Sequence, residues 1–284
     1  MLKTIALIDG SVYGQSVCDA AAWVAHRTGA SVDLLHVLGR RDGAGGVTDL
    51  SGSIGLGART ALLEELAELD AQKARLAQKR GRALLDDAKQ RLQAAGVETV
   101  STQLRYGDLA ETVQEFERDA HLLVLGKRGE AADFAKLHLG SNLERVVRST
   151  RRPILVASRT FKPVERFLIA FDGGASATKA IDHIVRGNMF SGLPCTLLMV
   201  GREDASSRGQ LEIAANTLRD GGFSVDARIE AGQPENVISQ AVERDGIDML
   251  VMGAYGHSRI RTLIIGSTTT EMIRSCMIPI MLFR

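Results

Sequence analysis

The sequence predicts an α/β protein with two doubly wound domains, each a five-stranded parallel sheet with helices on both faces. The first supporting observation is an alternation of short apolar runs with longer amphipathic stretches along the chain, which is typical of parallel sheets covered by helices. The second is an internal repeat, because Asp9-Gly10, which follows the first apolar run, recurs 163 residues later as Asp172-Gly173. A repeat of this length indicates duplicated domains rather than a solenoid.

The elements follow the same order in both halves. In the first half we expect strands at residues 4–8, 34–37, 100–104 and 154–157, a fourth strand directly before Gly126, and a helix at 15–28. In the second half we expect strands at residues 167–171, 197–200, 225–229, 249–252 and 278–283, and helices at 176–190 and 235–244. The short segment 158–166 contains Pro163 and separates the halves. We therefore expect two domains, residues 1–160 and 161–284.

The first half carries an insertion of 36 residues around 40–95. Equivalent positions in the two halves are 163 residues apart before it but only 127 apart after it, at Gly126 and Gly253. Residues 40–57 are rich in glycine and are expected to form a mobile loop. Residues 58–95 are rich in Ala, Leu, Glu, Lys and Arg, which predicts one long helix with a candidate break at Gly81. We interpret its charges as a solvated face, and its acidic residues argue against a basic membrane-binding face.

A glycine-rich stretch, DMLVMGAYGHSRIRTLIIGSTTT, begins at Asp248 in the second half. It places an apolar run before two glycines, and nine residues later a Gly-Ser pair at the expected start of a helix. Glycines let backbone N–H groups approach an anion closely, and a helix N-terminus favours negative charge. These residues alone are also consistent with a structural loop. The first half repeats the pattern in HLLVLGKRGEAADFAKLHLGSN, with ten residues in place of nine between the second and third glycines.

The spacing Gly-x2-Gly-x9-Gly-Ser after a buried strand, closed by the apolar run CMIPIMLF, resembles the nucleotide-binding branch of the universal stress protein family. The resemblance covers nearly the whole chain as two tandem copies. It implies the strand order 3-2-1-4-5 in each copy, with a crevice between the first and fourth strands where ligands of such sheets bind. It also implies that the fifth strands of the two copies pair as a pseudo-dimer within the chain, and it allows a homodimer of tandem chains.

The resemblance further implies a stress-response protein that binds adenine nucleotide, ATP or AMP, with or without Mg²⁺, as a sensor or adaptor for an unknown protein partner. In this family the first-strand carboxylate holds ribose or a metal on phosphate, and the end of the second strand offers backbone groups to adenine. The matching positions in the second half are Asp172, Val200, Gly253, Gly256, Gly266, Ser267 and Thr268, with Asp172 as the candidate Mg²⁺ ligand. The weaker set in the first half is Asp9, Val37, Gly126, Gly129, Gly140, Ser141 and Asn142. Alternatively, Asp172 caps the helix that follows it.

The two pockets are expected to differ, with the C-terminal one the better nucleotide site. The extra residue before Gly140 must bulge, and a shift of about 1 Å spoils aligned hydrogen bonds. Glu130 also places a carboxylate near the expected phosphate position. Lys127 and Arg128 add positive charge to the same loop and oppose this effect.

Two other functional classes stay open. A slow Mg²⁺-dependent ATPase is one, although the chain contains no GxxxxGK[ST], GxSxG or HExxH motif and no residue stands out as a general base. A protein-interaction module that acts through the 40–95 insertion is the other. We therefore expect a binding protein with no catalytic residues rather than an enzyme.

Composition limits the partners and the compartment. The formal charge of +1 and the aromatic content of 4% do not favour binding to nucleic acid or to an anionic membrane. Cys18, Cys195 and Cys276 are far apart and are expected to be reduced core thiols. Because no signal peptide and no apolar span of membrane length stand out, the expected location is the cytoplasm.

Overall fold

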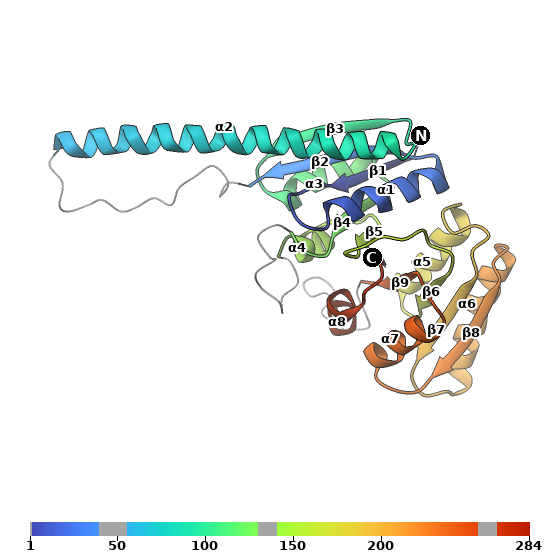
Figure 1. Cartoon of the computed structure of the whole chain (residues 1–284). Coiled ribbons are helices and arrows are strands. Elements are labelled where there is room, and N and C mark those ends of the chain that lie inside the picture. The colour runs from blue at the N-terminus through green and yellow to red at the C-terminus, as the bar shows by residue number, and fades with distance from the viewer. Residues whose placement is uncertain (1, 40–55, 130–140, 255–265) are drawn as a thin grey trace.

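The computed structural model describes residues 2–39, 56–129, 141–254 and 266–284, without the side chains of residues 56–61 and 141. Within these residues the strands form one ten-stranded sheet in the order β3-β2-β1-β4-β5-β10-β9-β6-β7-β8 (Figure 1). The strands are β1 (Lys3–Leu7), β2 (Ser31–Leu38), β3 (Val100–Tyr106), β4 (Leu122–Gly126), β5 (Ile154–Ala157), β6 (Phe167–Ala170), β7 (Cys195–Val200), β8 (Val225–Glu230), β9 (Met249–Gly253) and β10 (Ile280–Phe283). Counted from its outer edge, each half has the order third, second, first, fourth, fifth.

The two halves join through their fifth strands. Every strand pair within a half is parallel, whereas β5 and β10 pair antiparallel, with Met281 opposite Leu155. Both strands are buried along their whole length. The antiparallel pair relates the two halves by a local pseudo-two-fold axis. The prediction that the fifth strands pair within the chain is therefore confirmed.

Helices cover both faces of the sheet. They are α1 (Gly14–Thr28), α2 (Leu56–Ala94), α3 (Leu109–Phe116), α4 (Ser141–Ser149), α5 (Ala175–Arg186), α6 (Ala205–Asp220), α7 (Pro234–Arg244) and α8 (Ser267–Ser275), with a short 3-10 helix η1 (Glu117–Asp119). One buried core contains side chains of α1, α2, α5 and α6, and the other contains side chains of α3, α4, α7 and α8. This three-layer arrangement is the predicted α/β class.

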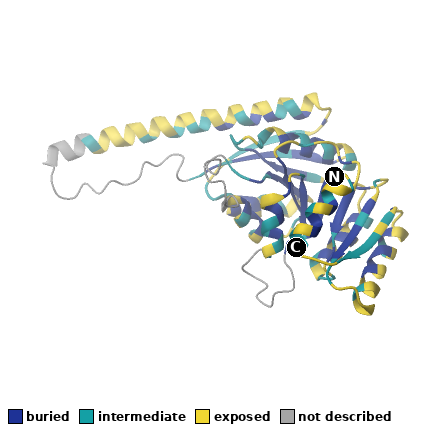
Figure 2. Ribbon diagram, turned by 60° about the horizontal axis from the view of Figure 1, so that its bottom comes forward, coloured by how far each residue is buried: buried dark blue, intermediate teal, exposed yellow. Residues whose placement is uncertain are grey.

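Helix α2 runs for 39 residues without interruption, so the break expected at Gly81 is wrong. A Cβ atom on Gly81 would lie 2.8 Å from Cδ2 of His36 and 2.9 Å from Cδ1 of Leu104. Glycine therefore lets the helix approach β2 and β3, at an intrinsic cost of only about 1 kcal/mol. Residues 56 and 57, expected in the loop, belong to the helix, while residues 40–55 lie outside the described part. Most of the N-terminal part of the helix from residue 62 is exposed, as Figure 2 shows.

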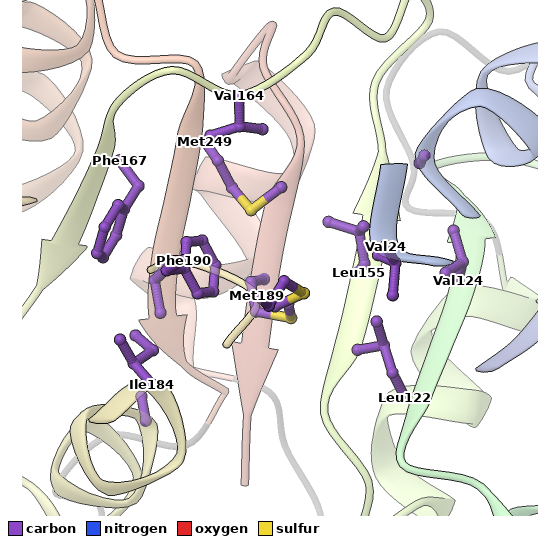
Figure 3. Packing of buried hydrophobic residues seen from close by; sticks show 14 of the residues in the cluster. Val24, Leu122, Val124, Leu155, Val164, Phe167, Ile184, Met189, Phe190 and Met249 are labelled. Carbon is purple, nitrogen blue, oxygen red and sulfur yellow. The ribbon is translucent and has the colours of Figure 1, made fainter. Parts of the chain in front are cut away.

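Aromatic and aliphatic side chains pack where the two halves meet. Trp23 of α1 lies 6.1 Å from Phe161 and 6.2 Å from Phe190 between ring centroids. Figure 3 shows Met189 and Phe190 on the C-terminal side of this core and Val24 and Leu155 on the N-terminal side. The Nε atom of Arg27 donates a hydrogen bond to the Met189 carbonyl at 2.8 Å. Helix α5 ends at Arg186 rather than at residue 190, and the segment after it belongs to this contact.

The three cysteines are free and buried, which confirms the prediction of core thiols. Burial raises the pKa of Cys18 to about 12, and it also raises the pKa values of Cys195 and Cys276. Thiolate formation at neutral pH is therefore suppressed. Among the helices that the structure describes, none has the length and apolarity needed to cross a membrane.

Candidate functional site

A cavity of about 800 Å³ lies at the carboxyl ends of β1, β2 and β4 in the N-terminal half. It occupies the point where the strand order reverses, between β1 and β4, and its volume suits a small-molecule ligand. Its lining includes five predicted site residues: Asp9, Val37, Gly126, Gly129 and Asn142. The cavity therefore gathers residues that lie more than a hundred positions apart in the sequence.

The carboxylate of Asp9 faces the glycine-rich loop. Its Oδ1 atom accepts a hydrogen bond from the backbone N–H of Ser11 at 3.0 Å. A Cβ atom on Gly129 would lie 3.2 Å from the Oδ2 atom of Asp9 and 3.9 Å from the Nδ2 atom of Asn142. The structure thus brings Asp9, Gly129 and Asn142 into contact range around one corner of the cavity.

The first glycine of each loop has a packing role. A Cβ atom on Gly126 would lie 2.5 Å from the Cβ of Tyr13, and one on Gly253 would lie 3.0 Å from the Cβ of Ser176. Tyr13 is the N-cap of α1, and Ser176 is the second residue of α5. A larger residue at position 126 would therefore clash with the first helix of its half, whereas at position 253 the contact is only tight, whatever ligand binds beside it.

In the C-terminal half, the predicted residues follow three neighbouring strands. Asp172 follows β6, Val200 ends β7 and Gly253 ends β9, and β6 pairs with both of the others. Ser267 is the first residue of α8, whose N-cap is Gly266. The Thr269 hydroxyl donates to the Gly253 carbonyl at 3.0 Å, so the start of α8 is fixed beside the end of β9, with its first-turn N–H groups pointing toward its N-terminus.

Asp172 closes a turn rather than capping a helix. Its Oδ1 atom accepts from the backbone N–H of Gly174 at 2.8 Å, while Gly174 itself is the N-cap of α5. The alternative interpretation of Asp172 as a helix cap is therefore wrong. Asp9 makes the equivalent bond to the residue two positions ahead, so both halves use one carboxylate oxygen in the same way.

Three residues named in the sequence analysis lie outside the described part of the chain: Gly140, Gly256 and Glu130. Ser141 begins α4, but its side chain is not described. Thr268 is partly buried in the first turn of α8.

Lys127 does not supply its charge to the cavity in the N-terminal half. Its side chain is buried, with 9% exposure, and its Nζ atom donates to the carbonyl of Cys276, the C-cap of α8 in the other half. Burial lowers the pKa of Lys127. The expectation that this residue adds positive charge near a phosphate is therefore wrong, because the ammonium group instead lies at the negative end of a helix.

Three further lining residues were not predicted: His36, Asp108 and Arg145. Asp108 is the N-cap of α3, accepts from the backbone N–H groups of Ala110 and Glu111, and pairs with Arg145 of α4. Burial acts to raise the pKa of Asp108, but the hydrogen bond from Arg145 and those from the backbone hold it below its usual value. Asp108 could have been identified from the sequence, because a Gly-Asp turn precedes a helix there. Arg145 could not, because it lines the cavity only through the position of α4 in the fold.

Among the described residues, no group of three or more His, Cys, Asp and Glu side chains could hold a metal. Mg²⁺ is commonly bound by one or two carboxylates together with substrate phosphates. Asp9 or Asp172 could serve as that carboxylate.

Comparison with known proteins identifies the family. The model of the universal stress protein family matches residues 1–158 and 196–284. The chain is 38% identical over 287 aligned positions to universal stress protein Slr1230 of Synechocystis sp., with all of both chains covered. In structure it is similar to a universal stress protein from Archaeoglobus fulgidus, with a TM-score of 0.72, 21% identity, and 99% and 98% of the two chains covered. A universal stress protein from Pseudomonas aeruginosa gives a TM-score of 0.61 at 17% identity, with 99% of this chain and 92% of the other covered. The chain belongs to the universal stress protein family.

Proposed function

We propose that this universal stress protein binds adenine nucleotide, ATP or AMP, at the carboxyl ends of the strands in each half, and acts as a sensor or adaptor. The observation that carries the proposal is the cavity of about 800 Å³ lined by Asp9, Val37, Gly126, Gly129 and Asn142. Its size fits a nucleotide. Asp9 or Asp172 takes the ribose or a phosphate-bound Mg²⁺, and the helix starts at Ser141 and Ser267 take phosphate.

Support for two sites comes from the repeated backbone. Each half ends its first strand with an aspartate whose Oδ1 atom accepts from the N–H two residues later. Each half also begins its last helix with a serine, at Ser141 and Ser267. We extend the site by sequence to Gly140 and Gly256, and we assign residues 1–160 and 161–284 as the two binding domains.

Nucleotide is held rather than turned over in this proposal. Asp108 is already engaged by Arg145 and by two backbone N–H groups, and Asp9 by the N–H of Ser11. Neither carboxylate is arranged as a base for an attacking water. Steady-state ATP hydrolysis should therefore fall well below the roughly 1–100 per second of phosphoryl-transfer enzymes. A rate within that range, lost on Asp9→Asn or Asp172→Asn substitution, would make the protein an ATPase.

The direct test is a mass spectrum of small molecules released from freshly purified full-length protein. ATP or AMP in stoichiometric amount supports the proposal. A ligand-free preparation that also fails to bind either nucleotide in calorimetry would contradict it.

A protein-interaction role has its own support in α2. Four leucines of this helix are markedly exposed: Leu63, Leu66, Leu69 and Leu76. Exposed apolar side chains grouped on one element are typical of interaction surfaces. In an adaptor this surface would engage the partner. Replacing the four leucines with glutamine should then remove partner binding without changing nucleotide affinity, and a loss of nucleotide affinity would argue against separate roles.

A further inference from the structure

A second cavity, of about 530 Å³, lies between the two halves. Residues at the amino ends of β1 and β4 and at the end of α1 line one side. The end of α5 and the segment after it line the other side. The cavity thus lies at the opposite end of β1 and β4 from the proposed nucleotide site. Its volume is within the range of small-molecule sites.

The walls of this cavity are apolar. Val24 and Leu122 contribute from the N-terminal half, and Ile184, Met189 and Phe190 contribute from the C-terminal half. Figure 3 shows these five side chains in the packed region where the halves meet. All five are buried, with exposures between 1% and 7%. A ligand body placed here would therefore be held by apolar contact with both halves.

The titratable side chains of the lining are basic. They are His121, His183 and Arg186, and no described lining residue is an aspartate or a glutamate. The other polar lining residues are neutral: Thr4, Thr28 and Asn188. The Nδ1 atom of His121 accepts from the backbone N–H of Lys3 at 3.3 Å, so a neutral ring carries its proton on Nε2 and can donate from it. Burial lowers the pKa of His183, and the neighbouring His121 lowers it further, so the guanidinium of Arg186 is the permanent charge in this lining.

Two helix ends partly offset this positive charge. Helices α1 and α5 both end at lining residues, Thr28 and Arg186, and each C-terminus carries about half a negative charge. Arg27, in the last turn of α1, donates to the carbonyls of Met189 and Ser191 beside the cavity. The full charges of Arg27 and Arg186 together exceed the two fractional ones, so the sum of these four charges favours an anion.

We propose that this cavity binds a small apolar molecule with one carboxylate, whose body contacts Met189 and Phe190 and whose carboxylate pairs with Arg186. This site is separate from the nucleotide site and does not depend on it. Because its walls come from both halves, an occupied cavity stabilises their packing.

Trp23 provides a built-in reporter. It is the single tryptophan of the chain, and its ring lies 6.2 Å from that of Phe190. We would titrate the full-length protein with decanoate, decanamide and decyltrimethylammonium and follow tryptophan emission, with calorimetry in parallel. Decanoate should bind saturably and at least tenfold more tightly than the ammonium probe, and saturating ATP should not displace it. Equal affinity for the three probes, displacement by ATP, or the absence of both heat and emission change would overturn the proposal.

Three variants test whether decanoate binds in this cavity and pairs with Arg186. Arg186→Gln should weaken decanoate about tenfold and leave decanamide unchanged, because only the carboxylate makes a charge-assisted bond. Thr28→Phe should block both probes by filling the cavity while the melting temperature shows that the fold persists. The matched control is Arg219→Gln, an arginine on α6 that pairs with Glu212 outside the cavity, and it should change neither affinity. Unchanged decanoate binding in Arg186→Gln or in a folded Thr28→Phe variant would contradict the assignment.

Discussion

The N-terminal and C-terminal halves share a scaffold but differ around their candidate pockets. Both halves keep the aspartate turn after the first strand and a serine at the start of the last helix. One turn into that helix, however, the N-terminal half has Arg145 where the C-terminal half has Glu271. The N-cap of the third-strand helix is Asp108 in one half and Gln233 in the other. Duplication has thus preserved the backbone of the site while the charges that surround it diverged.

The halves also differ in which residue of each one caps a helix end in the other. Lys127 of the N-terminal half donates to the end of α8 at Cys276, but the equivalent residue in the other loop is Ala254, which has no charge to offer. Instead, Arg284 after β10 donates to the carbonyls of Arg148 and Thr150 at the end of α4. Two cations at non-equivalent positions therefore stabilise equivalent helix ends.

The largest expected effect distinguishes α2 from α6, the helices that follow the second strand of each half. Gly81→Ala in α2 should lower the free energy of unfolding by up to about 2 kcal/mol, because the cost of roughly 1–3 kcal/mol for the new methyl group against His36 and Leu104 exceeds the gain of about 1 kcal/mol in helix propensity. Gly209→Ala in α6 has open space around the new Cβ and should raise it by about 0.5–1 kcal/mol. Urea unfolding measures both. Equal effects in the two variants would show that α2 does not pack closely at Gly81.

The next effect concerns the two cationic residues that cap helix ends, Lys127 and Arg284. Burial lowers the pKa of Lys127, so between that lowered value and about 10.4 the unfolded chain binds more protons at this residue than the folded chain does. The stability of the wild type should therefore rise relative to Lys127→Met as the pH approaches 10, by at most about 1.4 kcal/mol per pH unit.

Arg284→Met is the control for this pH dependence. A guanidinium stays charged up to pH 10, so the stability difference between this variant and the wild type should not change with pH. Urea unfolding at pH 7, 8, 9 and 10 gives both curves. A constant difference for Lys127→Met as well would mean that its ammonium group is solvated in the folded protein.

A smaller effect tests the charges around the pockets. Arg145→Glu should weaken nucleotide binding in the N-terminal half about fivefold, and Glu271→Arg should strengthen binding in the C-terminal half by a similar factor, since two charges about 4 Å apart in water interact by about 1 kcal/mol. Both effects should shrink at high salt. Calorimetry at two salt concentrations measures them. If neither substitution changes the affinity, phosphate does not bind near these residues.

Local patterns in the sequence predicted the strands, whereas the strand order and the pairing of the fifth strands were implied by the resemblance to the universal stress protein family. Apolar runs marked nearly every strand, and the apolar fifth strands needed a partner, which β5 and β10 provide for each other. The break at Gly81 was wrong because helix propensity does not include the close approach to His36. Asp9, Gly129 and Asn142 line one cavity, while their role in binding a ligand stays a prediction.

Long-range contacts were not predictable in the same way. Lys127 lies beside two loop glycines in the sequence, but its partner Cys276 is 149 residues away. His121 and His183 lie 62 residues apart in the sequence, and they share a cavity only because the halves pack together. Arg145 reaches Asp108 because α3 and α4 are neighbours in the fold. These contacts are set by how elements pack, which composition and periodicity do not encode.

We propose that the chain binds nucleotide most tightly in the C-terminal half. The most direct test is calorimetric titration of ATP into the intact protein and into Gly266→Glu and Gly140→Glu variants whose melting shows that they fold. Gly266→Glu places a carboxylate at the N-cap of α8, where it would repel phosphate, and should abolish the tight site. Gly140→Glu should leave that site intact. If Gly140→Glu abolishes tight binding and Gly266→Glu does not, the order of the two sites is the reverse of this account, and if the intact protein takes up no nucleotide, the account is wrong.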